Sequence, residues 1–573
     1  MNSPSLNAAS EAGKTSALGR WDSVFQIGLQ LCIAIGVGMR LLWLDKRELW
    51  YDEVLSLLLS TGQKNAYRLP DDVPFAIKDF APLLRIPPEK NVLDTVETVK
   101  NLLKGNLSEP HPPLLYLSTH GWIRLFGTRE AALHSLMVLM SLITLVAAYF
   151  LGRRLLGRRG GLMFTALLAL NPFFLSHSLD LRMYSPLLLW VSISGACLLA
   201  LMGIDKSDAT ASRPEGWPCW VLRAGVALPL TAGLLTQYLF GYWFFAMIAL
   251  VLYLDRKRWF EHGLTIGAGF LLFMPWGLWG TLKQINNRRD VLDRLSSDGG
   301  LLTTALQHGK DLAQTLANYL LIGHLSTSMQ PLGEPIKPTA VAIGCGVIGF
   351  VVMCFIGIYR RRQYQVLIAC SLVGLFPLLL ALGVDILGGK NTLGFGWGRA
   401  TIVVLPGCVL LVAAWLEVAT GRWREILTAG LLAVYIGVNV ADFGMRDRQM
   451  FHALNTALLA DDVPTLVVMN SRAWGHVQRL VYYLDEEANP DVLASDPAKV
   501  TKALEAALAA KDYRRVLWFR ANYPLWGQPE TEAEAEAFIA STEQLLQDRY
   551  LLAASQSLTG TMNLDSFELQ IYQ

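Results

Sequence analysis

The sequence places paired acids, a histidine and several cations at the ends of apolar segments, where they could do chemistry together. Asp52 and Glu53 stand side by side in "RELWYDEVLSL", directly after the first apolar run. A positioned carboxylate can act as a general base that takes a proton from a hydroxyl. The plainer interpretation is a charged first turn of a helix, where the helix dipole favours carboxylates. The pair alone leaves both interpretations open.

Two further segments carry polar residues beside apolar runs. In "HPPLLY", His111 precedes two prolines that fit a helix start, and an ordinary turn residue is the alternative. The short connection "SLDLRMYSP" holds Asp180, Arg182 and Tyr184 between two apolar runs. Asp180 and Arg182 could close this turn as a local ion pair. Alternatively, Arg182 could clamp an anion while Tyr184 lies near the lipid headgroups.

The segment "GGKNTLGFGWGRA" supplies two more cations, Lys390 and Arg399. Its glycines allow an irregular backbone close to a ligand. Arg399 falls in the first turn of an apolar run, where the helix dipole opposes a cation. We therefore expect an anionic ligand to hold it there.

Together, these residues predict a phosphate site with a base beside it. Arginine makes bidentate contacts to phosphate, and a lipid phosphate lies at headgroup depth. A carboxylate at the same depth can accept a proton from an acceptor hydroxyl. The predicted site consists of Asp52 and Glu53 for catalysis, and of His111, Asp180, Arg182, Tyr184, Lys390 and Arg399 for substrate binding.

The composition indicates that a membrane protein positions these residues. The 573 residues are 53% hydrophobic and only 17% charged, whereas soluble proteins carry roughly 25% charge. A net charge of +2 gives no support for a nucleic-acid partner. The 7 cysteines lie in or beside apolar runs without metal-ligand spacing, so we expect small buried hydrophobic residues.

Apolar runs long enough to cross a bilayer recur along the chain. We expect an all-α polytopic membrane domain of about 11 transmembrane helices. The shorter apolar run at 111–127 indicates an interfacial helix rather than a span. The predicted spans are 22–44, 133–152, 160–178, 186–203, 219–236, 239–254, 262–280, 338–358, 364–385, 400–417 and 424–441.

Basic residues in the short loops predict the orientation. The loops at 152–161, 255–259, 359–364 and 421–425 are basic and are expected in the cytoplasm of a multi-pass cell (inner) membrane protein. The N-terminus is then cytoplasmic, and Asp52 lies on the other side of the membrane. The expected domains are a cytoplasmic N-terminal tail, 1–21; a transmembrane domain, 22–441, with a first outer loop, 45–132; and an extracytoplasmic domain, 447–573.

The C-terminal region, 447–573, reads as a small α/β domain. Strand-like runs at 465–470 and 515–520 alternate with helical patterns at 497–512 and 531–550. It has no phosphate loop and no nucleophile elbow, so we expect a scaffold or acceptor-docking role.

An ordered set of motifs resembles the glycosyltransferase family 39 type of integral-membrane enzymes, within the GT-C superfold. These enzymes include protein O-mannosyltransferases and lipid A aminoarabinose transferases. The resemblance covers about residues 22–441. In chain order, the motifs are "LWYDEVLS", "HPPLLYLSTHGWIRLFG", "LGRRLLGRRGGL", "LDLRMYSPLLL", "LLTQYLFGYWFF", "MPWGLW" and "GRATIVVLP".

The resemblance implies transfer, with inversion, of a sugar from a polyprenyl-phosphate donor to a hydroxyl on a lipid, protein or polysaccharide acceptor. Asp52 would be the catalytic base, Glu53 would support it or help to hold a metal, and Arg182 and Arg399 would contact the donor phosphate. Metal dependence stays open, with a divalent ion as the one candidate cofactor. The chain departs from the family pattern at Asp180, which stands one residue before the usual acid, and at His134, where an arginine is expected.

Two other functions fit the composition. A transporter or flippase of lipid-linked sugars would need charged or broken helices near the bilayer midplane. A non-catalytic scaffold would act through its C-terminal region. Since the charges gather at the ends of the spans, the sequence favours the transferase.

Overall fold

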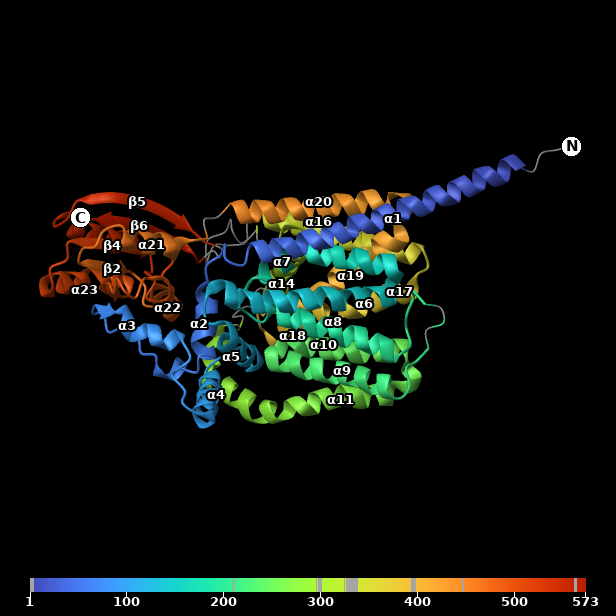
Figure 1. The fold of residues 1–573 in the computed structure, drawn as a ribbon, viewed down its shortest axis with the longest axis horizontal. Helices are drawn as coiled ribbons and strands as arrows, with labels where there is room; N and C mark the ends of the chain where they lie inside the picture. Colours follow the sequence, from blue (N-terminus) through green and yellow to red (C-terminus); the bar gives the residue numbers. More distant parts are fainter. Residues whose placement is uncertain are drawn as a thin grey trace.

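The structure is a computed structural model with a helical bundle and a mixed β-sheet at one end of it (Figure 1). The first helix of the chain extends beyond the opposite end of the bundle (Figure 1). The described residues are 5–208, 210, 212–294, 296, 301–323, 325, 338–392, 398–445, 448–560 and 564–573.

The bundle consists of apolar helices that run nearly side by side (Figure 1). Its long helices are α1 (Ser5–Leu42), α6 (Glu130–Leu170), α8 (Tyr184–Leu201), α9 (Trp217–Thr236), α10 (Gly241–Leu254), α11 (Trp259–Trp276), α14 (Leu301–Ala317), α16 (Pro338–Arg360), α17 (Tyr364–Val373), α18 (Leu375–Gly388), α19 (Leu405–Ala419) and α20 (Arg424–Gly444). Short helices α7 (Pro172–His177), α12 (Leu282–Asn287) and α13 (Arg289–Arg294) connect some of them.

Within the described residues, 8 helices are long and apolar enough to cross a membrane, or up to 9 if the bent pair α17 and α18 is one span. The sequence predicts about 11 transmembrane helices, which is more than this number, for a physical reason. Helix α6 contains two predicted spans and turns back at Gly157, whose φ of 84° is left-handed. A Cβ on Gly152 would lie 3.1 Å from the Gly161 Cα, which shows the two halves packed together. Each predicted span thus falls on one helix or on two consecutive helices.

The end of the bundle away from the sheet gathers several of the basic loops. Arg159, just after the turn at Gly157, pairs with Asp22 of α1 at 2.7 Å and with Glu417 of α19 at 2.7 Å. Arg424, at the start of α20, lies 3.6 Å from the same Glu417. Two basic loops and the start of the first predicted span, which the sequence predicts on one side of the membrane, therefore meet.

The other end of the bundle carries the segment between α1 and α6. Its elements are α2 (Tyr51–Ser60), β1 (Phe75–Ala76), α3 (Ile77–Phe80), α4 (Val92–Asn106) and α5 (Leu114–Phe126). Helix α5 covers the run predicted as interfacial, and with 13 residues it is too short for a span.

The sheet has six strands in the order β1-β3-β2-β4-β6-β5. Strands β2, β3 and β4 are parallel, and the other pairs are antiparallel. The C-terminal elements are α21 (Met450–Leu459), β2 (Thr465–Met469), α22 (Trp474–Tyr483), β3 (Asp491–Ala494), α23 (Pro497–Ala510), β4 (Arg515–Ala521), α24 (Glu532–Gln547), β5 (Leu552–Thr559) and β6 (Ser566–Tyr572). The predicted all-α membrane domain with a small C-terminal α/β region is confirmed.

Successive side chains of a strand point to opposite faces of the sheet, so the central strands contribute to two different cores. Leu466 and Trp518 face a small core with α23. Val467 and Phe519 face the large core that continues into the bundle. Strand β1, from the loop before α5, extends this sheet through a pairing with β3 that no sequence pattern predicts.

Candidate active site

Glu53 is fully buried and holds three chain segments together. Its carboxylate accepts hydrogen bonds from the backbone N–H of Trp50, at 2.9 Å, and from that of Leu181. His134 Nε2 of α6 lies 3.3 Å from Glu53 Oε1. These partners offset the cost of burying a charge. Glu53 therefore fixes the start of α2 against the connection between α7 and α8.

Asp52 has a different environment, because its side chain is 34% exposed. Arg182 Nη2 lies 3.6 Å from Asp52 Oδ2. Arg182 Nη1 donates to Ser56 Oγ at 2.9 Å, and Ser56 Oγ donates to the Asp52 carbonyl at 2.8 Å. Arg182 is only 8% exposed, and its Nε has no hydrogen-bond partner among the described residues. A partly exposed carboxylate thus stands beside a buried guanidinium that Ser56 holds in place.

His111 lies close enough to Arg182 for the two to interact. Burial first, and then the positive charges of Arg182 and Arg288, hold the pKa of His111 well below its usual value. The imidazole is therefore neutral at pH 7. The His111 carbonyl accepts hydrogen bonds from Asn106 at 3.0 Å and from Gln284 at 2.8 Å, which fix the chain before α5.

Arg399 joins this group through Trp50. Its guanidinium carbon lies 5.2 Å from the centroid of the Trp50 ring, a cation–π contact at the residue that precedes α2. Tyr184, at the start of α8, is buried, and its ring lies 4.3 Å from the His177 ring. Part of the glycine-rich segment before Arg399, residues 393–397, lies outside the described residues.

Two predicted binding residues have their contacts elsewhere. Asp180 is buried and pairs with Arg47 and, at 2.6 Å, with His177. The Lys390 amine donates to Ser296 at 2.6 Å, and its carbonyl accepts from His308 of α14 at 2.7 Å. Asp180 and Lys390 therefore have partners other than Asp52.

The C-terminal region packs directly against the segment that carries the acids. A Cβ on Gly475 of α22 would lie 2.5 Å from the Tyr51 ring. Tyr483 OH accepts a hydrogen bond from the Leu49 N–H at 2.7 Å. His452 Nδ1 of α21 lies 2.9 Å from Glu48. The residues on both sides of Trp50 are therefore held by α21 and α22.

Sequence reasoning missed several of these residues. Ser56 could have been found, because it lies four residues after Asp52 and so on the same helix face. His134 was noted only as a departure from the family pattern, and its contact with Glu53 joins elements far apart in the sequence. Gly475 gives no sequence signal, since only the packing of α22 on Tyr51 shows why a side chain would not fit there.

Within the described ranges, no group of three or more histidine, cysteine, aspartate or glutamate side chains could hold a metal ion. Both carboxylate oxygens of Glu53 already accept backbone hydrogen bonds. Among the described residues, Glu53 is therefore not part of a group that could hold a metal ion.

Residues 110–279 match the family model described as dolichyl-phosphate-mannose-protein mannosyltransferase. This range contains His111, Arg182 and Tyr184, and it confirms the resemblance to this class of membrane glycosyltransferase. None of the curated proteins matches the chain in sequence.

Solved structures of membrane glycosyltransferases are similar to the chain at low sequence identity. ArnT from Cupriavidus metallidurans, bound to undecaprenyl phosphate, is 11% identical, with a TM-score of 0.49 over 94% of this chain and 97% of that one. The Archaeoglobus fulgidus oligosaccharyltransferase, tethered with an acceptor peptide, is 12% identical, with a TM-score of 0.47 over 93% and 72%. The S. cerevisiae protein O-mannosyltransferase Pmt1-Pmt2 complex, bound to the sugar donor, is 11% identical, with a TM-score of 0.28 over 48% and 34%.

Proposed function

We propose that this protein is an inverting membrane glycosyltransferase that moves a sugar from a polyprenyl-phosphate donor to an acceptor hydroxyl on the extracytoplasmic face. The observation that carries the proposal is the partly exposed Asp52 carboxylate beside the buried guanidinium of Arg182. Arg182 lies within the residues that match the mannosyltransferase model. The acceptor class, whether lipid, protein or polysaccharide, is left to experiment.

Asp52 acts as the general base in this proposal. It is the accessible member of the acidic pair, since Glu53 is fully buried and hydrogen-bonded. The acceptor hydroxyl gives its proton to the Asp52 carboxylate as its oxygen attacks the anomeric carbon on the face opposite the phosphate. This arrangement corresponds to inverting sugar hydrolysis with a lipid phosphate as the leaving group. The C–O bond to the phosphate breaks, and the phosphate keeps the electron pair.

The departing phosphate needs stabilisation of its charge rather than a proton. Arg182 Nη2 lies 3.6 Å from the Asp52 carboxylate, and the Arg399 guanidinium lies over the ring of Trp50, two residues before Asp52. Fixed cations in a partly buried site stabilise developing negative charge more strongly than they would in water. A neutral His111 near Arg182 adds no competing positive charge.

A reconstituted assay tests the proposal. Purified protein in proteoliposomes is given a polyprenyl-phosphate sugar with a labelled sugar and extracts of envelope lipids, glycans and proteins as acceptors. Asp52→Asn should lower transfer by about 10²–10⁴-fold, the usual contribution of a general base. Asp45→Asn is the matched control, because Asp45 is a 64% exposed carboxylate just before the same segment.

The outcomes separate the candidate functions. If Asp52→Asn folds normally but loses transfer, and Asp45→Asn keeps normal transfer, the result supports Asp52 as the general base. Full activity of Asp52→Asn would remove Asp52 from the mechanism. Movement of the labelled donor across the bilayer without its consumption would show a transporter instead.

A further inference from the structure

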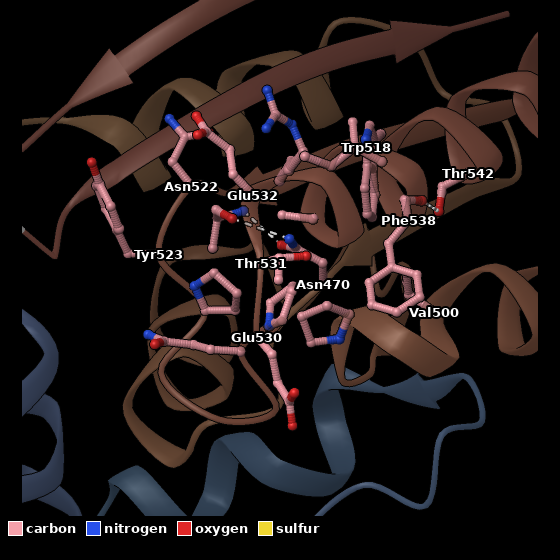
Figure 2. A pocket seen from close by; sticks show the side chains of 18 residues that line it. Asn470, Val500, Trp518, Asn522, Tyr523, Glu530, Thr531, Glu532, Phe538 and Thr542 are labelled. Carbon is pink, nitrogen blue, oxygen red and sulfur yellow. Dashed lines mark hydrogen bonds between the residues drawn. The ribbon is translucent and has the colours of Figure 1, made fainter. Parts of the chain in front are cut away.

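A cavity of about 550 Å3 lies in the C-terminal region, and none of the residues that line it belongs to the candidate active site (Figure 2). Its size falls in the range of small-molecule sites. Asn470, just after β2, and Ala521, the last residue of β4, lie on its wall. Pro497 at the start of α23 and Thr531, which caps α24, also line it.

The cavity lies where parallel sheets bind ligands. The chain passes from β2 to β3 on one side of it and then to β4 on the other side, so the β2–β4 pair is a topological switch point. Ligands bind in the crevice at the carboxyl ends of such strands. The Asn470 side chain holds the two ends together, accepting from the Ala521 N–H at 2.7 Å and donating to the Ala521 carbonyl at 3.0 Å.

Two hydrogen-bond donors on the cavity wall lack an acceptor. Trp518 is 1% exposed, and its indole N–H has no partner in the part of the chain that the structure describes. The same holds for Nε of Arg520, although its Nη2 pairs with Glu568. Both residues come from β4 and, two positions apart, face the same side of the sheet. Both nitrogens are fully buried, so they lie behind the cavity surface and do not themselves contact a ligand.

The opposite wall is apolar. Of the 16 residues of α24, only Thr542 and Leu546 are buried. Phe538 and Ile539 line the cavity instead of packing into the core. Phe538 and Val500 lie on one side of the view in Figure 2, and Asn522 and Tyr523 on the other. The cavity thus offers an apolar face and a polar rim.

The charges on the wall select against an anion. Glu530 and Glu532 lie at the start of α24, and the Arg520 charge is neutralised by Glu568. The wall therefore admits an uncharged ligand with hydroxyl groups at its edges and apolar C–H faces. A saccharide has these properties, and Tyr523 and Phe538 provide aromatic surfaces for its faces.

We propose that this cavity is a binding site for a neutral saccharide. The site stands apart from the chemistry at Asp52 and does not depend on the proposed transfer. Asn522 and Gln528 are the amides on its wall that can bond hydroxyl groups.

The experiment uses full-length protein with Asp52→Asn in lipid nanodiscs, so that any transfer at that site is disabled. The probes are an array of neutral oligosaccharides of hexoses, N-acetylhexosamines and pentoses, with inorganic phosphate as the anionic probe. Hydrogen–deuterium exchange then locates the bound probe. We expect at least one saccharide to bind and to protect the end of β4 and the first half of α24.

Variants on the wall test the assignment. Tyr523→Ala and Gln528→Ala should each weaken saccharide binding by tenfold or more while the thermal unfolding midpoint stays unchanged. Trp526→Ala is the matched control, because Trp526 is 38% exposed on the same loop and does not line the cavity.

Failure of every neutral saccharide to bind would overturn the proposal. Binding of phosphate in their place, or saccharide binding lost in Trp526→Ala but kept in Tyr523→Ala, would overturn it equally. Transfer activity measured in the protein with native Asp52 reports on the proposed function separately, so the two can fail independently.

Discussion

At the scale of single residues, the two neighbouring acids have different environments and therefore different tasks. Asp52 is partly exposed beside Arg182, whereas Glu53 is fully buried and accepts two backbone hydrogen bonds. Adjacent helix residues point about 100° apart, which allows this division. Asp52 is the carboxylate that can contact a substrate, and Glu53 holds Asp52 in position.

Glu53→Gln tests the positioning role. Each oxygen of the Glu53 carboxylate now accepts one backbone N–H. In the glutamine variant, an NH2 group replaces one of these oxygens, so at least one buried N–H loses its acceptor. We expect a loss of about 1–3 kcal/mol in the free energy of unfolding. Thermal unfolding in detergent checks this, with Asp52→Asn as the reference that keeps wild-type stability. Equal stability of Glu53→Gln and wild type would show that its contacts matter little to folding.

Substitutions at Arg182 test whether its guanidinium stabilises the departing phosphate of the donor. Arg182→Ala should lower the rate of transfer by about 10²–10³-fold, as for removal of a fixed donor to a developing charge. Arg182→Lys should recover part of the rate, because it restores the charge but not the planar, five-donor geometry. Steady-state kinetics measure both, with the exposed Arg129→Ala as the control. A full rate in Arg182→Ala would exclude this role.

At the scale of elements, α22 sets the position of the start of α2. Gly475 of α22 leaves room for the Tyr51 ring, to which an added Cβ would come within 2.5 Å. Gly475→Ala should therefore destabilise the protein by about 1–3 kcal/mol through overpacking, and it should also lower transfer because Tyr51 precedes Asp52. Unfolding and activity are measured together.

A matched glycine separates this clash from a general effect of alanine. A Cβ on Gly437 of α20 would meet no atom within 4 Å, so Gly437→Ala should leave transfer unchanged and should not destabilise the protein. The double variant Gly475→Ala with Tyr51→Ala removes the clash and should recover stability. If Gly475→Ala behaved like Gly437→Ala, the contact between α22 and α2 would not control the site.

His452 of α21 makes the stability of the contact with the segment before α2 depend on pH. The hydrogen bond to the Glu48 carboxylate raises the pKa of the His452 ring, and burial opposes this increase. Because the folded-state pKa exceeds the unfolded value, the stabilising contribution is fully present below about pH 6.5 and is lost as pH rises through the folded-state pKa. The difference in unfolding midpoint between wild type and His452→Gln should therefore shrink from pH 6 to pH 8, as measured in parallel scans. A difference that grew with pH would contradict this.

At the scale of the whole molecule, local patterns predicted the elements but not the contacts between them. Hydropathy located the spans, and strand-like runs located β2 and β4, because these signals lie within short windows. The partners of Asp180 and Lys390 could not be predicted, since Arg47 is 133 residues from Asp180 and Ser296 is 94 residues from Lys390. The two-residue strand β1 was also out of reach, because it exists only through its pairing with β3.

The placement of the whole chain in the membrane decides whether the proposed site can meet its donor. Arg159, Asp22 and Glu417 meet at one end of the bundle, and helix α2 and the sheet lie at the other. Because basic loops stay in the cytoplasm, we expect residue 158 to be cytoplasmic and residue 526 extracytoplasmic. Single cysteines at these exposed positions, in a Cys345→Ser background that removes the exposed native thiol, are labelled in intact cells with a membrane-impermeant maleimide. The cysteine at 526 should react before permeabilisation and the one at 158 only after it. The opposite pattern would place Asp52 in the cytosol and exclude an extracytoplasmic transfer.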